Sequence, residues 1–181
     1  MASKDGFSTT YGVELNKLEA EVAEKRGHKI FREEISKIHF PETFDLISMW
    51  DVFEHIKDGK DFLTGLKSKL SNHGLVLLQI PTSAALAARI MQEKCNMFDG
   101  LEHVNLYSPE NVREIAKKTG YEVLEMVSVI PEIPVMDNYL RYEDPYRGER
   151  KAQNELLSIL DENTILENLL GYKLQIILRS S

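Results

Sequence analysis

The chain has few of the residues that cross-link or interrupt a fold: one cysteine, six prolines and ten glycines in 181 residues. A lone Cys95 forms no internal disulfide, which suits a reducing compartment. No His or Cys lies at metal-ligand spacing beside it, so the sequence predicts no zinc site, and no other metal site is predicted. We interpret the thiol as a core or helix-surface group.

Basic residues are also scarce, with 22 Lys and Arg against 29 Asp and Glu and a formal net charge of −7. Phosphate-rich partners require clustered Lys and Arg, so this charge argues against a nucleic-acid partner and against an anionic membrane surface. No apolar run approaches the ~20 residues of a membrane span, and the first residues lack the apolar core of a signal peptide. These absences predict a cytoplasmic protein.

The residues that are present alternate between strand and helix patterns, and the length predicts one domain over residues 1–181. Such alternation predicts an α/β fold with a mostly parallel sheet, in which one of the last two strands runs antiparallel at the edge. Residues 131–150 are predicted to form a lid or a loop. Strands are predicted at 10–15, 28–31, 44–49, 75–80, 121–130 and 171–179. Helices are predicted at 16–27, 58–72, 84–94, 108–120 and 149–160, with a further turn or two up to 169. Asn16 is predicted to cap the first of these helices, and Ser108 followed by Pro109 to start the fourth.

The most informative segment is FDLISMWDVFEHI, from Phe44 to Ile56. It begins as a buried strand and ends as a polar turn that carries acids and a histidine. The apolar run GLVLLQIP, from Gly74 to Pro81, follows at the spacing of one βαβ unit. Because α/β enzymes bind ligands at the carboxyl ends of such strands, this segment predicts one wall of a ligand crevice.

Four blocks, in this order and spacing, resemble class I S-adenosylmethionine (SAM) dependent methyltransferases, in particular the small-molecule branch related to ubiquinone-biosynthesis O-methyltransferases. The match runs from Tyr11 to Ile130. The blocks are YGVEL from Tyr11, FDLISMWDVFEHI from Phe44, LKSKLSNHGLVLLQIP from Leu66 and EHVNLYSP from Glu102. The resemblance implies a Rossmann-like methyltransferase sheet, SAM as the cofactor and methyl transfer to a small-molecule acceptor.

The resemblance also implies residues that hold the nucleoside of SAM. Glu14 ends the first predicted strand, where a carboxylate can accept hydrogen bonds from the ribose hydroxyls. The alternative is a capping or surface acid. Glu34 and Ile35 follow the next strand, at the place that holds adenine, although Glu33 competes for the register.

The end of the third predicted strand is implied to line the methionine part of SAM. Trp50 and Asp51 lie there, and the Trp50 ring could face the sulfonium by cation–π attraction. An aromatic plug between strand and helix is the alternative. His55, beside Glu54, is a candidate acid/base residue, or it belongs structurally to the turn.

His103 and Tyr107 are further candidates for the acceptor side, with a staple at the start of the next helix as the alternative. Methyl transfer is an in-line displacement, so alignment and desolvation carry most of it. A general base is required only for a poor nucleophile such as a hydroxyl.

One block of the family pattern is missing from the sequence: a strand, a Gly-x-Gly loop and a helix should precede Tyr11. The sequence therefore predicts an N-terminally truncated sheet that lacks the central strand between the strands ending at Glu14 and Trp50. Each backbone group left buried and unpaired costs ~1–3 kcal/mol. We expect those two strands to pair directly, or a homodimer to form through their exposed edges.

Two functions stay open on these residues. The first is a SAM-dependent methyltransferase with a small-molecule acceptor. The second is a truncated or non-catalytic module that does not bind SAM alone and acts in protein association. A different nucleotide-binding enzyme of the doubly wound class, such as a dehydrogenase, is the poorest interpretation, since the chain contains no Gly-x-Gly-x-x-Gly.

Overall fold

The computed structural model describes residues 6, 9–148, 157 and 160–180. The chain divides into two compact units, residues 1–42 and 43–181. Each unit has its own sheet: two strands in the smaller unit and four in the larger one.

The smaller unit is a minimal βαβ arrangement of β1 (Tyr11–Val13), α1 (Lys17–Lys25) and β2 (Lys29–Phe31). β1 pairs in parallel with β2. The predicted cap of α1 is confirmed, because the side chain of Asn16 accepts a hydrogen bond from the amide of Leu18. Its aromatic core is small, and the rings of Tyr11, Phe31 and Phe40 contact one another within it.

The larger unit is built on a four-stranded sheet whose order is β3-β4-β6-β5. Its strands are β3 (Phe44–Trp50), β4 (Leu70–Pro81), β5 (Tyr121–Val129) and β6 (Lys173–Ser180). β3 is parallel to β4, whereas β6 is antiparallel to both β4 and β5. Three strands therefore point the same way, and the expected antiparallel strand is present as β6, beside the outer strand β5.

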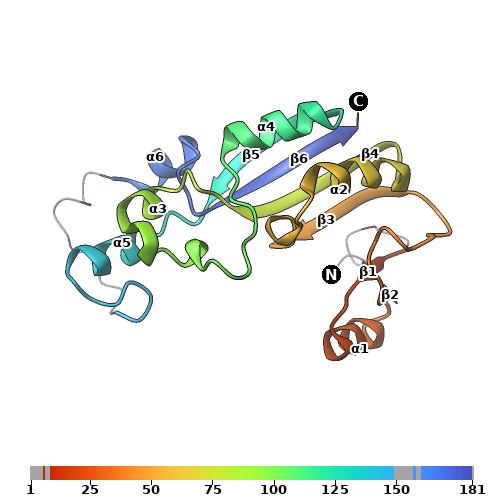
Figure 1. Ribbon diagram of the computed structural model, residues 1–181, viewed down its shortest axis with the longest axis horizontal. Helices are drawn as coiled ribbons and strands as arrows, with labels where there is room; N and C mark the ends of the chain where they lie inside the picture. The colour runs from red at the N-terminus through yellow and green to blue at the C-terminus, as the bar shows by residue number, and fades with distance from the viewer. Residues whose placement is uncertain (1–5, 7–8, 149–156, 158–159, 181) are drawn as a thin grey trace. The chain divides into compact units, whose positions relative to one another are not determined.

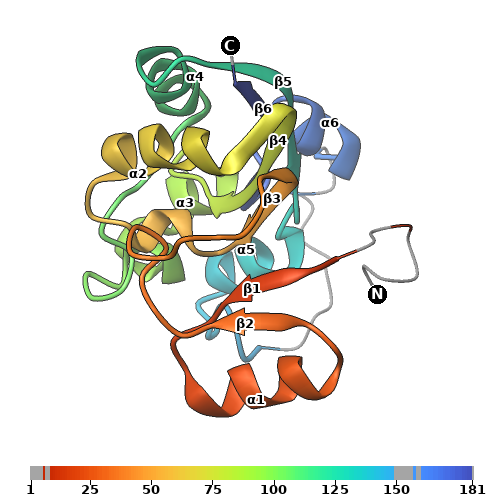
Figure 2. The same ribbon diagram turned by 90° about the vertical axis from the view of Figure 1, so that its right-hand side faces the viewer.

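Helices cover both faces of this sheet (Figures 1 and 2). α2 (Gly59–Leu66) and α4 (Pro109–Lys118) lie on one side, and α6 (Glu162–Glu167) lies on the other, against β5. α3 (Leu86–Met91) and α5 (Ile133–Leu140) pack together beyond one end of the strands. Short 3₁₀ segments complete the described residues: η2 (Phe53–His55), η3 (Lys67–Lys69), η4 (Gln92–Lys94) and η5 (Asn96–Phe98).

Two element boundaries differ from the prediction. The helix predicted to run to residue 72 ends at Leu66, and β4 already begins at Leu70, because Leu70 pairs with Phe44 of β3. Residues 133–140, predicted as part of a lid or loop, form α5, which buries Met136 completely. Most of the helix predicted at 149–160 lies outside the described residues.

Among the described residues, β3 is the outer strand at one end of the larger sheet. β1 pairs with β2 in the sheet of the smaller unit, and the direct pairing of β1 with β3 stays a prediction. β3 pairs with β4 on one side and buries only Met49. The expectation of a buried strand is wrong, since Leu46 and Trp50 are 37% and 52% exposed.

Candidate functional site

The candidate site of the larger unit begins where β3 ends. The amide of Asp51 donates to the carbonyl of Gln79 on β4 at 2.9 Å. Asp51 then adopts a left-handed conformation, with φ of 55°, and the chain turns into η2. Phe53 anchors that turn, because its buried ring stacks on Tyr107 with the centroids 5.0 Å apart. This packing fixes the residues that follow at the carboxyl end of the sheet.

Asp51 forms an ion pair with Lys173, which the sequence did not predict. Lys173 Nζ lies 2.5 Å from Asp51 Oδ2, while Asp51 Oδ1 is buried and has no hydrogen-bond partner among the described residues. Lys173 opens β6, far along the chain, so no local pattern could have indicated this pair. The neighbouring Trp50 is 52% exposed, which argues against the aromatic plug and leaves its ring accessible.

Glu54 and His55 on η2 lie beside His103 from the loop before α4. One ligand-type atom from each of the three residues lies within 4.8 Å of the others. The His55 and His103 rings are 5.1 Å apart. Glu54 is completely buried, and this burial raises the pKa of its carboxyl. Its own backbone amide and the two histidines lower this pKa, and nearby Asp51 raises it. The structure thus brings together two predicted site residues and an acid whose burial the sequence did not reveal.

Hydrogen bonds to backbone carbonyls determine the tautomers of the His55 and His103 rings. His55 Nδ1 lies 2.7 Å from the carbonyl oxygen of Glu102, and His103 Nδ1 lies 3.0 Å from that of Met97. Since a carbonyl only accepts hydrogen bonds, both Nδ1 atoms carry a proton, and in the neutral rings Nε2 holds the lone pair. Asp99 Oδ2, 3.1 Å from His103 Nδ1, supports the same assignment.

Tyr107 packs into the interior. Its side chain is 7% exposed and stacks on Phe53. Burial, followed by the negative charges of Glu54 and Asp58, raises the pKa of Tyr107 to about 12. This burial favours a structural role for Tyr107 over a role on the acceptor side.

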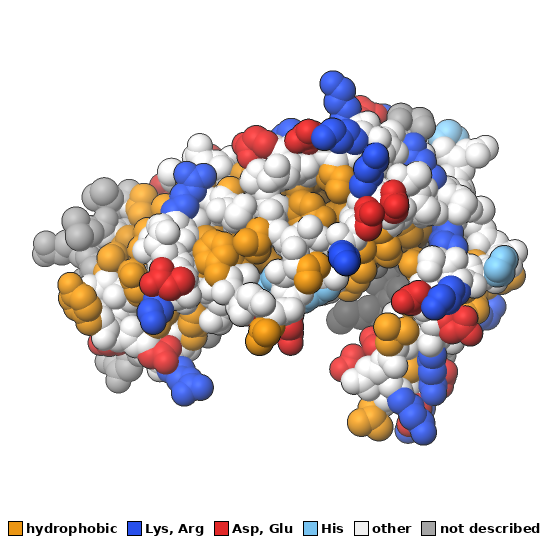
Figure 3. All heavy atoms as spheres, viewed as in Figure 1, with side chains coloured by type: hydrophobic (Ala, Val, Ile, Leu, Met, Phe, Trp, Pro, Cys, Tyr) orange, Lys and Arg blue, Asp and Glu red, His pale blue; other side chains and the backbone are white. Residues whose placement is uncertain are grey.

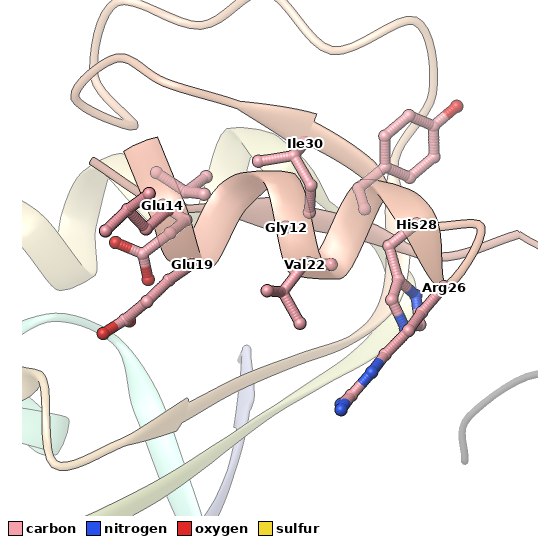
Figure 4. A pocket seen from close by; sticks show the side chains of 11 residues that line it. Gly12, Glu14, Glu19, Val22, Arg26, His28 and Ile30 are labelled. Atoms are coloured by element: carbon pink, nitrogen blue, oxygen red, sulfur yellow. The ribbon is translucent and has the colours of Figure 1, made fainter. Parts of the chain in front are cut away.

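The smaller unit has a separate hollow, a groove of about 630 Å³ between β1, α1 and β2. Figure 4 shows the acids Glu14 and Glu19 at one end, Arg26 and His28 at the other, and apolar side chains between them. Its lining consists of Tyr11, Gly12, Val13, Glu14, Leu18, Glu19, Val22, Ala23, Arg26, His28 and Ile30. A mixed apolar and charged lining of this kind can bind a small organic ligand.

Two of the predicted nucleoside contacts have local partners in the smaller unit. Glu14 Oε1 accepts a hydrogen bond from the amide of Asn16 at 2.7 Å, so this acid does cap its own turn. Glu34 is exposed and pairs with Lys37 at 3.0 Å, and Ile35 opens the short turn that follows. The groove is lined by Glu14 but not by Glu34 or Ile35.

Among residues 6, 9–148, 157 and 160–180, no helix combines the length and the apolarity needed to cross a membrane.

Comparisons with solved structures bear on the fold. A chain of the complex between the Trm112 methyltransferase activator and a methyltransferase of Haloferax volcanii is similar, with a TM-score of 0.68 and 13% identity, covering 99% of this chain and 74% of that one. A SAM-dependent methyltransferase of Thermotoga maritima gives 0.61 and 17%, covering 95% and 73%. An O-methyltransferase of Brevibacillus brevis, solved with S-adenosyl-L-homocysteine, gives 0.58 and 21%, covering 96% and 59%. These similarities confirm the Rossmann-like methyltransferase fold.

Comparisons of sequence go further. An uncharacterized protein of Methanocaldococcus jannaschii is 25% identical over 125 residues, which cover 68% of this chain and 61% of that relative. The chain thus spans about three fifths of the length of this relative. The family model described as "Methyltransferase domain" matches residues 1–126, well over half of the 181 residues. The chain therefore belongs to the methyltransferase-domain family.

Proposed function

We propose that the chain is a SAM-dependent methyltransferase acting on a small-molecule acceptor, in a branch related to ubiquinone-biosynthesis O-methyltransferases. The observation that carries the proposal is the family match over residues 1–126, which spans both units. The structural neighbours from Brevibacillus brevis and Synechocystis were solved with S-adenosyl-L-homocysteine bound, which supports SAM as the cofactor.

In this proposal, Glu14 binds the ribose hydroxyls of SAM. Trp50 and Asp51 contact its methionine part. Glu14 lines the groove of the smaller unit, and its capping bond to Asn16 occupies Oε1. Trp50 presents an accessible ring, where a sulfonium cation gains from the electron-rich face. The ion pair with Lys173 orients the Asp51 carboxylate. Transfer is an in-line displacement, so these residues act by binding and aligning the reactants.

Trp50 is the only tryptophan in the chain, which makes the test direct. We expect the protein to bind S-adenosylhomocysteine in calorimetric titration, with a parallel change in Trp50 fluorescence. Glu14→Gln should weaken binding by roughly 10–100-fold, because a hydrogen bond to a charged group contributes ~1.5–3 kcal/mol. Glu21→Gln is the matched control, since Glu21 lies on α1 outside the groove lining. No binding at millimolar concentration would overturn the proposal.

A second candidate function, protein association, is favoured by an exposed apolar stripe in the smaller unit. Leu15, Leu18 and Val22 are 67%, 73% and 48% exposed, and hydrophobic side chains stand at the surface over α1 at the lower right of Figure 3. Such patches mark association sites. The Haloferax volcanii neighbour is itself solved in a complex with an activator protein.

This candidate predicts a homodimer that depends on the stripe. Light scattering should show a dimer for the wild-type chain and a monomer for Leu18→Glu with Val22→Glu, because charges at the contact resist burial. Glu21→Lys, which reverses a charge on α1 beside the stripe rather than within it, is the control and should leave the dimer intact. A wild-type monomer at all concentrations would count against self-association.

A further inference from the structure

Glu54, His55 and His103 form a compact cluster of metal-ligand side chains. One nitrogen or oxygen from each lies within 4.8 Å of the others, and His55 Nε2 is 3.9 Å from Glu54 Oε1. The distance between His55 and Glu54 is too long for a direct hydrogen bond. Atoms that bind one metal ion at ~2.0–2.2 Å lie within ~4.4 Å of one another, so small movements of these side chains bring all three within reach of one ion.

The burial of the Glu54 carboxylate is the observation that favours a bound cation. Its side chain is fully buried, and apart from its own backbone amide no described group hydrogen-bonds either carboxylate oxygen. A buried carboxylate without a partner is strongly unfavourable. A bound cation would supply the compensating charge that the surrounding protein does not.

Both histidines are oriented as metal ligands usually are. The Nδ1 proton of His55 is donated to the carbonyl of Glu102, and that of His103 to the carbonyl of Met97, with the Asp99 carboxylate beside it. Metal-binding histidines generally donate their second ring N–H to a carbonyl or carboxylate, which fixes the tautomer and leaves the other nitrogen for the metal.

The two segments that supply the ligands are tied together by backbone contacts. The Asn105 amide donates to the carbonyl of Glu54 at 3.0 Å, and Asn105 Nδ2 donates to the carbonyl of Ile56 at 2.6 Å. With the bond from His55 to Glu102, these contacts hold the His103 loop on η2. The ligand set is therefore preorganised by the fold before any ion binds.

We propose that Glu54 together with Nε2 of His55 and of His103 binds one divalent first-row transition-metal ion. Two imidazoles with one carboxylate suit Zn²⁺ or Fe²⁺ better than Mg²⁺, which prefers oxygen ligands throughout. Three protein ligands leave a position open for water or for an oxygen atom of a small molecule. A nitrogen bound to a metal is not free to take a proton, so this site replaces the acid/base role predicted for His55 and His103. It does not depend on SAM binding.

The test is calorimetric titration of the chelator-treated full chain with Zn²⁺, alongside Co²⁺ and Mg²⁺. We expect one equivalent of Zn²⁺ at micromolar affinity or tighter, a Co²⁺ complex with visible d–d absorption, and much weaker Mg²⁺ binding. His103→Ala and Glu54→Gln should each weaken Zn²⁺ binding by at least ~100-fold. Asp99→Asn, which alters only an outer partner, should weaken it by ~10–100-fold.

His73→Ala is the matched control, because His73 is an exposed histidine on β4 outside the cluster. It should bind Zn²⁺ like the wild type. Glu54→Gln should be at least as stable as the metal-free wild type, because it removes the buried charge, and it should lose the thermal stabilisation that Zn²⁺ gives the wild type.

The proposal is overturned if the wild type binds none of the transition metals, or if His103→Ala, Glu54→Gln and Asp99→Asn all bind Zn²⁺ as tightly as His73→Ala. Should His103→Ala fail to fold, the isosteric Glu54→Gln and Asp99→Asn variants decide the matter by the same titration. Failure of S-adenosylhomocysteine to bind would leave the metal site standing, so the two proposals fail separately.

Discussion

Helices α1 and α2 carry the same kind of apolar pattern, yet only α2 buries it. Leu63 and Leu66 of α2 are 0% and 1% exposed, whereas Leu18 and Val22 of α1 are 73% and 48% exposed. α2 lies on a four-stranded sheet, while the sheet of the smaller unit has two strands of three residues each. A periodic stripe thus indicates which face of a helix seeks a partner, and only the surrounding structure determines whether that face is covered.

The largest expected effect is the difference in stability between the same Leu→Ala substitution in α2 and in α1. Leu63→Ala should lower the free energy of unfolding by ~2–5 kcal/mol, because it leaves a cavity in a packed core. Leu18→Ala should change it by no more than ~0.5 kcal/mol, since that side chain is largely in water. Urea unfolding of both variants measures the difference. A comparable loss for Leu18→Ala would mean that the stripe on α1 is covered in solution.

Two glycines, one in a strand of each unit, extend the comparison from the helices to the strands. A Cβ at Gly74 of β4 would lie 2.6 Å from the backbone oxygen of Phe44, whereas a Cβ at Gly12 of β1 would meet only the end of the Ile30 side chain, at 2.7 Å. Gly74→Ala should cost ~1–3 kcal/mol, because the paired strand would have to shift. Gly12→Ala should lie within ~1 kcal/mol of the wild type, since the Ile30 side chain can rotate away. Denaturant midpoints compare the two variants.

Glu132 gives the larger unit a pH dependence of its own. Burial raises the pKa of Glu132 from 4.5 to about 7, and Lys173 opposes the rise. The Cys95, Tyr146 and Tyr172 side chains also interact with this carboxyl. Because the folded protein holds this proton more tightly than the unfolded chain, the stabilisation is complete below about pH 4.5 and is lost as the pH rises through about 7.

After allowance for partial solvent screening, the loss across this pH range should be on the order of 1–2 kcal/mol. Glu132→Gln should abolish it. Glu24→Gln in the smaller unit is the control, because this surface acid pairs with Arg32 at 3.1 Å, and it should retain the wild-type profile. Thermal unfolding between pH 4.5 and 7.5 measures all three proteins, and an unchanged slope in Glu132→Gln would contradict the assignment.

The smallest effects are expected at the helix caps. Ser108 makes a capping box with Asn111 at the start of α4, so Ser108→Ala should lower global stability by ~1 kcal/mol. Asn16→Ala removes the side-chain cap of α1 and should mainly speed amide exchange within residues 17–25, because α1 buries little. Equal global losses for the two variants would show that the smaller unit unfolds together with the larger one.

Local patterns gave the elements and their caps. The apolar run before Pro81 predicted β4, and Ser108 followed by Pro109 predicted the start of α4, because strand burial and capping depend on neighbouring residues. The predicted end of this helix at residue 72 was wrong, because Leu70 fits both the apolar face of α2 and the start of β4. Only the pairing of Leu70 with Phe44 selects the strand.

The site was predictable only in part, for the same reason. His55 and His103 were identified as candidates, and the fold brings their rings to 5.1 Å. The burial of Glu54, the hydrogen bonds that set the two tautomers, and the pairing of Asp51 with Lys173 could not be predicted. Each depends on segments far apart in the sequence that meet only in the folded unit.

By itself, the sequence determined the alternation of strands and helices, the capped helix starts and the resemblance to methyltransferases, since these depend on the order and spacing of neighbouring residues. Tertiary structure alone decided that β3 lies at the end of the described sheet, that α1 keeps its apolar stripe exposed, and that Glu54 is buried beside two histidines. Burial and the approach of distant side chains are properties of packing, and packing depends on which elements meet.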